Sequence, residues 1–213
     1  MAFSLEDLQD ALKRTADVLV ESKDLLTYID NLSGDGDLGI SMEKVGLSLI
    51  RELTAQPAVN PSELLFRCAR SININAPSTM GTLISFSVFE AAKQLKDKET
   101  IEDRDALIIP RKMVETIMIN GRAQLGDKTV LDALIPYSDA LQESYLECFD
   151  IVRAAKHAAL CAEDAANATK GCIAKIGRAK WIAERSRNCP DGGAVVCAII
   201  TNMLIHRRLE IQI

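Results

Sequence analysis

The sequence of 213 residues has few aromatic side chains, which make up 4% of it, although 48% of its residues are hydrophobic. A core of that size must be built from Leu, Ile, Val, Ala and Met, and this shortage of aromatic residues favours helices over strands. The net charge of −5 lacks the basic excess that is typical of nucleic-acid-binding domains. We therefore expect an all-α protein that does not bind nucleic acid.

Long apolar runs and targeting signals are missing as well. The longest apolar run, Gly193 to Ile200, is far too short to cross a bilayer, and the first residues carry Glu6 and Asp7 where a signal peptide is basic. The six cysteines form no CxxC pair, which is typical of free thiols in a cytosolic protein. His157 and Cys161 have helical spacing but no third ligand nearby, so simple packing explains them. These absences predict a cytoplasmic location and no membrane contact.

Apolar residues recur at helical spacing along nearly the whole chain. No linker or repeat interrupts the pattern, so we expect a single domain over residues 1–213 with antiparallel neighbouring helices. Polar, glycine-containing breaks separate the helices, and functional residues are expected in them. The expected helices cover residues 4–26, 40–53, 60–71, 80–95, 111–119, 129–147, 151–176 and 194–207, with a short basic helix between 177 and 193.

The break from Asp30 to Gly39 holds three carboxylates, those of Asp30, Asp35 and Asp37. Glycines on both sides of Asp35 allow a tight turn that can aim the carboxylates at one point. Carboxylates that converge repel each other unless a cation lies among them, and hard oxygen ligands select Mg²⁺ or Ca²⁺. The spacing is not that of an EF-hand, because a glycine replaces the third ligand and no Glu closes the loop. The alternative is an ordinary turn in which the aspartates cap helices.

Three further breaks have weaker signals, each with a structural alternative. The turn from Gly121 to Thr129 leads into a helix whose N-terminus could bind an anion, with charge added by Lys128, or could simply be capped. The segment 177–193 carries Arg178, which could bind phosphate, or it is a solvated basic face. In the segment 73–82, Ser78 and Thr79 could contact phosphate or cap the next helix.

Together, and in this order, the four segments resemble the L subunit, or nucleotide-binding domain, of dihydroxyacetone kinases. The family has an Asp before a Gly-Asp-x-Asp-x-Gly loop, which is matched by Asp30 and residues 34–39. It has a Gly-[Lys/Arg]-Ala-x-x-Gly-Asp-Lys-Thr segment, matched at 121–129. It also has Gly-Arg-Ala-x-x-x-x-Glu-Arg-Ser and a later Asp-Pro-Gly-Ala turn, matched at 177–186 and 191–194.

This resemblance implies an antiparallel barrel of eight helices that binds ADP or ATP at one end. It implies two Mg²⁺ ions held by Asp30, Asp35 and Asp37, and a kinase of small ketoses whose sugar lies on a K-type partner subunit. A phosphotransferase-system protein as phosphoryl donor and a homodimer stay open, as does the identity of the sugar, and no catalytic residue is assigned. The nucleotide contacts that the resemblance implies are Leu38, Ser41, Asn75, Ala76, Ser78, Gly121, Thr129, Val130, Arg178, Asp191 and Gly193.

Several positions depart from the family pattern. Leu38 replaces a His, and Ser41 replaces an Asn. The Gly-Gly-x-Ser-Gly-Pro loop is rewritten as residues 73–78, so that Ala76 stands where the family has its phosphate-contacting Ser, and Gly192 replaces a Pro. The alternative function is therefore a non-catalytic nucleotide-binding or regulatory homologue that acts as a partner-binding module.

Overall fold

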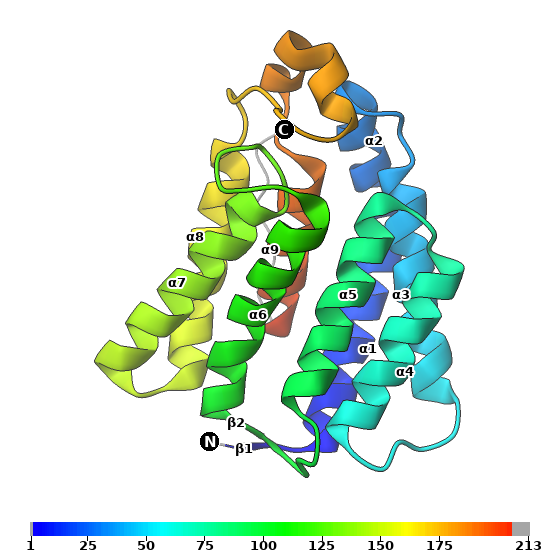
Figure 1. Cartoon of the computed structure of the whole chain (residues 1–213), viewed down its shortest axis with the longest axis vertical. Helices are drawn as coiled ribbons and strands as arrows, with labels where there is room; N and C mark the ends of the chain where they lie inside the picture. Colours follow the sequence, from blue (N-terminus) through cyan, green and yellow to red (C-terminus); the bar gives the residue numbers. More distant parts are fainter. Residues whose placement is uncertain (1, 206–213) are drawn as a thin grey trace.

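Figure 1 shows a computed structural model of the chain, which forms a bundle of α-helices. The structure describes residues 2–205, without the side chains of residues 178, 182, 183 and 185. Two strands of two residues each, β1 (Ala2–Phe3) and β2 (Ile101–Glu102), and a 3₁₀ helix, η1 (Arg178–Asn188), accompany the α-helices. Within the described range the α-helices are α1 (Leu5–Glu21), α2 (Lys23–Ser33), α3 (Leu38–Thr54), α4 (Pro61–Asn75), α5 (Thr79–Gln94), α6 (Asp103–Gly121), α7 (Leu131–Cys148), α8 (Ile151–Ala168) and α9 (Gly192–Leu204).

Eight of these helices close into a ring in which each packs against two neighbours. Starting at α1, the order is α1, α3, α4, α5, α6, α7, α8 and α9, and α9 packs back on α1. Neighbours in the ring run antiparallel (Figure 1). Helix α2 continues α1 beyond Ser22 and contacts α3, α9 and η1. The expected all-α, antiparallel eight-helix barrel is confirmed, with α2 as an extension at one end.

Small and aliphatic side chains fill the interior of the ring. Helix α8 buries a column of alanines, and alanine has so little bulk that α8 can lie close to α7 and α9. Helix α9 is buried on nearly all sides between Gly193 and Asn202, which is typical of a helix enclosed by its neighbours. None of the described helices is long and apolar enough to span a membrane.

Several helix boundaries differ from those expected. The first helix ends at Glu21, and α2 restarts at Lys23 and runs to Ser33, into the expected break. Helix α6 begins eight residues early because Glu102 and Asp105 form a capping box at its start, and Pro110 is accommodated inside it. Helix α8 ends at Ala168 rather than residue 176. The last helix is described only to Leu204, and residues 206 and 207 of the expected helix lie outside the described range.

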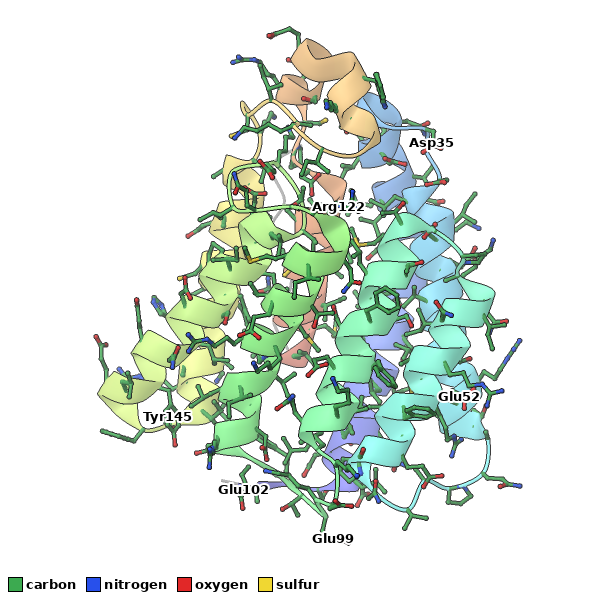
Figure 2. All side chains as sticks on the ribbon, in the orientation of Figure 1. Asp35, Glu52, Glu99, Glu102, Arg122 and Tyr145 are labelled. Atoms are coloured by element: carbon green, nitrogen blue, oxygen red, sulfur yellow. The ribbon has the colours of Figure 1, made fainter. Side chains whose placement is uncertain are left out.

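Alternating helix direction brings every second connection to the same end of the ring. The connections after α2, α4, α6 and α8 share one end, and they contain the four polar breaks noted in the sequence. Figure 2 shows Asp35 and Arg122 at this end and Glu99 and Glu102 at the other. The second end also holds the antiparallel strand pair, in which Ala2 lies opposite Glu102 and Phe3 opposite Ile101.

Candidate functional site

The three aspartates of the α2–α3 connection come together. Asp30 lies in the last turn of α2, Asp35 in the connection, and Asp37 directly before α3. One carboxylate oxygen from each lies within 4.8 Å of those of the other two, and they form the one such group of three metal-ligand residues among the described residues. Gly36, between Asp35 and Asp37, has a φ of 78°, a conformation that glycine adopts without strain. Asp37 makes no capping hydrogen bond to α3, so capping does not explain its position.

The chemistry of this cluster fits a hard divalent cation. Burial raises the pKa of Asp30, and the negative charges of Asp35 and Asp37 raise it further, against the lowering effect of the hydrogen bond that the Leu38 N–H donates to its Oδ2 over 3.2 Å. A cation among the carboxylates would reverse the repulsion. Mg²⁺ is held by oxygens at about 2.0–2.1 Å, so the three carboxylates would have to draw closer together around a bound ion.

A cavity of about 340 Å³ adjoins the carboxylates. This volume lies in the range of small-molecule sites, roughly 300–1,000 Å³. Its lining includes the first residues of helices that begin at this end of the ring: Leu38 of α3, Thr79 of α5 and Gly192 of α9, together with Val130 just before α7. Backbone N–H groups at helix N-termini attract anions. The cavity therefore combines carboxylates for a cation with helix ends suited to an anion.

Leu38 and Gly192 are in contact across the cavity wall. A Cβ at position 192 would lie 2.5 Å from Cδ2 of Leu38, which is closer than real contacts allow. Gly192 has no left-handed backbone conformation that would require glycine. An alanine at this position would therefore require the Leu38 side chain to move.

Helix caps hold the cavity rim in place. Asp191 Oδ1 accepts a hydrogen bond of 2.8 Å from the Ala194 N–H at the start of α9, and Ser78 Oγ accepts one of 3.0 Å from the Gly81 N–H at the start of α5. Burial raises the pKa of Asp191 to about 7, to which the charge of Asp132 contributes. Asp191 is thus poised between its charged and neutral forms near neutral pH.

Most of the expected nucleotide contacts line this cavity. The residues that do so are Leu38, Ser41, Ser78, Gly121, Thr129, Val130, Asp191 and Gly193, beside the three aspartates. Asn75 does not line the cavity. Its side-chain Nδ2 donates a hydrogen bond to the Ser71 carbonyl, and its Oδ1 accepts one from the Arg51 guanidinium. Ala76 is 1% exposed and does not line it either. The side chain of Arg178 lies outside the described residues, so its contact stays a prediction.

Sequence reasoning missed much of the apolar lining. Single residues such as Met80, Leu83 and Ile117 carry no motif, and the helical period marks them only as one face of a helix. Trp181 is 86% exposed and lines the cavity. In the sequence, the one feature that could have marked Trp181 is that it is the single tryptophan, a large side chain that lies within a polar segment.

Comparison with known proteins places this geometry in a family. The model of the family described as DAK2 domain matches residues 33–206. The chain belongs to the DAK2 domain family. The family expected from the sequence motifs is thereby confirmed, and the match covers the four connections that build the cavity but begins after Asp30.

Relatives of this DAK2 domain differ in how much of their length it covers. The chain is 33% identical over 192 residues to the L-erythrulose kinase of Pectobacterium atrosepticum, covering 89% of this chain but 32% of that protein. It is 24% identical to the ADP-binding subunit DhaL of the PEP-dependent dihydroxyacetone kinase of Escherichia coli, covering 96% of this chain and 97% of the subunit. The chain thus spans about a third of the first relative and nearly all of the second.

A solved structure shares the fold of this DAK2 domain. The dihydroxyacetone kinase from C. freundii in complex with AMP-PNP and Mg²⁺ superposes with a TM-score of 0.72 at 18% identity, covering 97% of this chain and 34% of that chain. This likeness supports the helical barrel.

The raised pKa of Asp191 predicts a pH-dependent stability. The folded chain retains a proton on Asp191 that the unfolded chain releases above its ordinary pKa of 3.8, so this contribution is complete below that value and is lost as pH rises to about 7. Asp191→Asn keeps the capping oxygen but does not titrate. The free energy of unfolding of the wild type, relative to this variant, should therefore fall between pH 4 and 7 by up to about 1.4 kcal/mol per pH unit. Urea unfolding at pH 5 and pH 8 measures this, and a difference that is independent of pH would contradict it.

The contact between Leu38 and Gly192 predicts a coupled pair of substitutions. Gly192→Ala should destabilise the wild type by about 0.5–1.5 kcal/mol, because the added methyl forces the Leu38 side chain into a less favourable conformation. In a Leu38→Ala background the same change should be neutral or stabilising, since alanine is a better helix former than glycine. Urea unfolding of the wild type, the two single variants and the double variant gives the coupling free energy between the two positions. Equal effects of Gly192→Ala in both backgrounds would rule the steric explanation out.

Proposed function

We propose that this chain binds ADP or ATP through Mg²⁺ and supplies a phosphoryl group to a small ketose held by a partner. The observation that carries the proposal is the cluster of Asp30, Asp35 and Asp37 beside a cavity lined by helix N-termini. The relatives named as kinases of erythrulose and dihydroxyacetone support the reaction class, and the structural neighbour with AMP-PNP and Mg²⁺ supports the ligands.

Each part of the cavity has a task in this proposal. A bound Mg²⁺, or two such ions, would neutralise the charge of the phosphate oxygens, which is the main requirement of phosphoryl transfer. Asp30, Asp35 and Asp37 hold the metal, while the helix N-termini that line the cavity at Thr79 and Gly192 attract the phosphates. The apolar lining, which includes Met80, Leu83 and Ile117, excludes water and accepts the base.

The ketose is proposed to lie on a K-type partner subunit or domain. The chain covers nearly all of a subunit named for ADP binding but about a third of the erythrulose kinase, which leaves two thirds of that enzyme for other tasks. The phosphoryl donor is either ATP itself or a phosphotransferase-system protein that recharges bound ADP. A kinase assay with each donor in turn distinguishes the two. Sedimentation analysis would test for a homodimer.

The non-catalytic homologue is the second candidate, because Asn75 and Ala76 of the rewritten loop do not line the cavity. A kinase assay with a K-type partner, Mg²⁺ and each phosphoryl donor in turn separates the two. Product formation supports the enzyme, whereas tight nucleotide binding without turnover on dihydroxyacetone or erythrulose supports the binding module.

Metal-dependent nucleotide binding is the first expected result. Calorimetry with ADP should give at least about tenfold tighter binding with Mg²⁺ than with EDTA, and Asp35→Asn should remove this gain, because one of three ligands is lost. Asp24→Asn, an exposed position on α2, is the matched control and should bind as the wild type does. Equal affinity for ADP with and without metal would contradict the proposed site.

Arg178 is expected to contact the nucleotide phosphates. Its backbone begins η1 directly after Gly177, which lines the cavity. A guanidinium bound to phosphate contributes about 1.5–3 kcal/mol, so Arg178→Ala should weaken Mg-ADP binding at least about tenfold. Lys180 is exposed, and Lys180→Ala should bind nearly as the wild type does. If the two variants bind equally well, the role of Arg178 is wrong.

A further inference from the structure

Lys128 is a buried cation in the connection between α6 and α7. The residue is 3% exposed, and its φ of 62° is uncommon for a residue with a side chain. Burial lowers the pKa of its ammonium group. A charged side chain in such a place needs compensating partners.

Three backbone carbonyls supply that compensation. The Lys128 Nζ donates to the carbonyl oxygens of Cys172 at 3.2 Å and Cys189 at 2.8 Å, and also to that of Ser186. An ammonium group has three N–H donors, so these three acceptors use all of them. The sequence suggested that Lys128 adds charge to a phosphate site, but this geometry leaves no N–H for a phosphate, although the side chain borders the cavity.

The three carbonyls lie at the two ends of one segment. Cys172 precedes η1, and Ser186 and Cys189 close it, so that a single ammonium group joins both ends of the stretch 172–189. We call this stretch the roof segment, because Ile176, Gly177, Ala179 and Trp181 within it line the cavity. Lys128 therefore ties a wall of the cavity to the α6–α7 connection.

The roof segment makes further contacts, of which η1 against α2 is one. The Lys175 N–H donates to the Asp127 carbonyl over 3.1 Å, and the Ala174 N–H donates to Ser186 Oγ over 3.1 Å. Among the side chains of this segment that the structure describes, most are exposed or half-buried, and the buried apolar ones are Ala174 and Cys189. The position of the roof segment therefore depends on these hydrogen bonds together with the contact between η1 and α2.

We propose that Lys128 is a positioning residue that holds the roof segment over the cavity and does not itself contact the ligand. The effect on ligand binding rests on the proposed nucleotide site, but the attachment of the roof segment does not. Loss of Lys128 should release the roof segment and weaken nucleotide binding. Once the phosphate contact proposed for Arg178 is also removed, the weakening should be the same for every nucleotide, whatever its number of phosphates.

Limited trypsin digestion without nucleotide tests the attachment. Lys128→Met keeps the length of the side chain but removes its donors, and cleavage after Lys180 and Arg187 should become at least about tenfold faster, as expected for a locally opened segment. Lys175→Met is the matched control, because Lys175 is exposed and makes one ion pair of 3.8 Å with Asp127. Its roof cleavage should stay within about threefold of the wild type, since exposed ion pairs contribute little.

Lys128→Gln is the second variant, should the methionine variant fail to fold. Glutamine is shorter and offers two N–H donors, so roof cleavage should rise by a smaller factor. The fluorescence of Trp181, the chain's single tryptophan, reports the same release as a change in anisotropy. Unchanged cleavage and anisotropy in a folded Lys128 variant would overturn the proposal.

Calorimetry with AMP and ADP, both with Mg²⁺, separates positioning from direct phosphate contact. Arg178 lies on the roof segment, so the comparison is made in an Arg178→Ala background, which lacks the phosphate contact proposed for that residue. If Lys128 positions the roof segment, Lys128→Met in this background weakens AMP and ADP by the same factor. A loss confined to ADP would mean that Lys128 binds the second phosphate, and it would overturn the proposal. If the wild type binds neither nucleotide, the proposed function fails, while the digestion experiment still decides the role of Lys128.

Discussion

Helix direction alternates around the closed ring, and this constraint determines where the chemistry can lie. Every second connection returns to the same end, so the polar segments after α2, α4, α6 and α8 meet although they are far apart in the sequence. The helices that begin there, α3, α5, α7 and α9, bring their first residues to the cavity. Tight packing of the alanines of α8 and the buried α9 keeps those helix ends in a fixed relation to one another.

The carboxylates and the buried ammonium group at this end of the ring have different surroundings. Asp30, Asp35 and Asp37 are held within 4.8 Å of one another, and burial together with their mutual repulsion raises the pKa of Asp30. The buried ammonium of Lys128 is instead matched by backbone carbonyls and used for attachment. The carboxylates therefore make the cavity unfavourable for phosphates until a cation binds, which couples the proposed metal and nucleotide sites.

Local signals in the sequence predicted the parts of the structure that local interactions form. Ser78 caps α5, one of the two roles that its position allowed, and the aspartates of the glycine turn converge. The break at Ser22 and the early end of α8 at Ala168 were missed, because contacts with distant segments decide them. Thr169, for example, ends α8 and accepts from the Asp191 N–H. The role of Lys128 stayed open for the same reason, since its carbonyl partners lie 44 to 61 residues away.

Crystals grown with Mn²⁺ and ADP would test the metal site most directly, by anomalous scattering at the manganese absorption edge. The three-aspartate site predicts an anomalous peak about 2.1 Å from carboxylate oxygens of Asp30, Asp35 and Asp37, and predicts its loss in Asp35→Asn crystals. A manganese ion bound elsewhere in the cavity, without contact to these carboxylates, would contradict it.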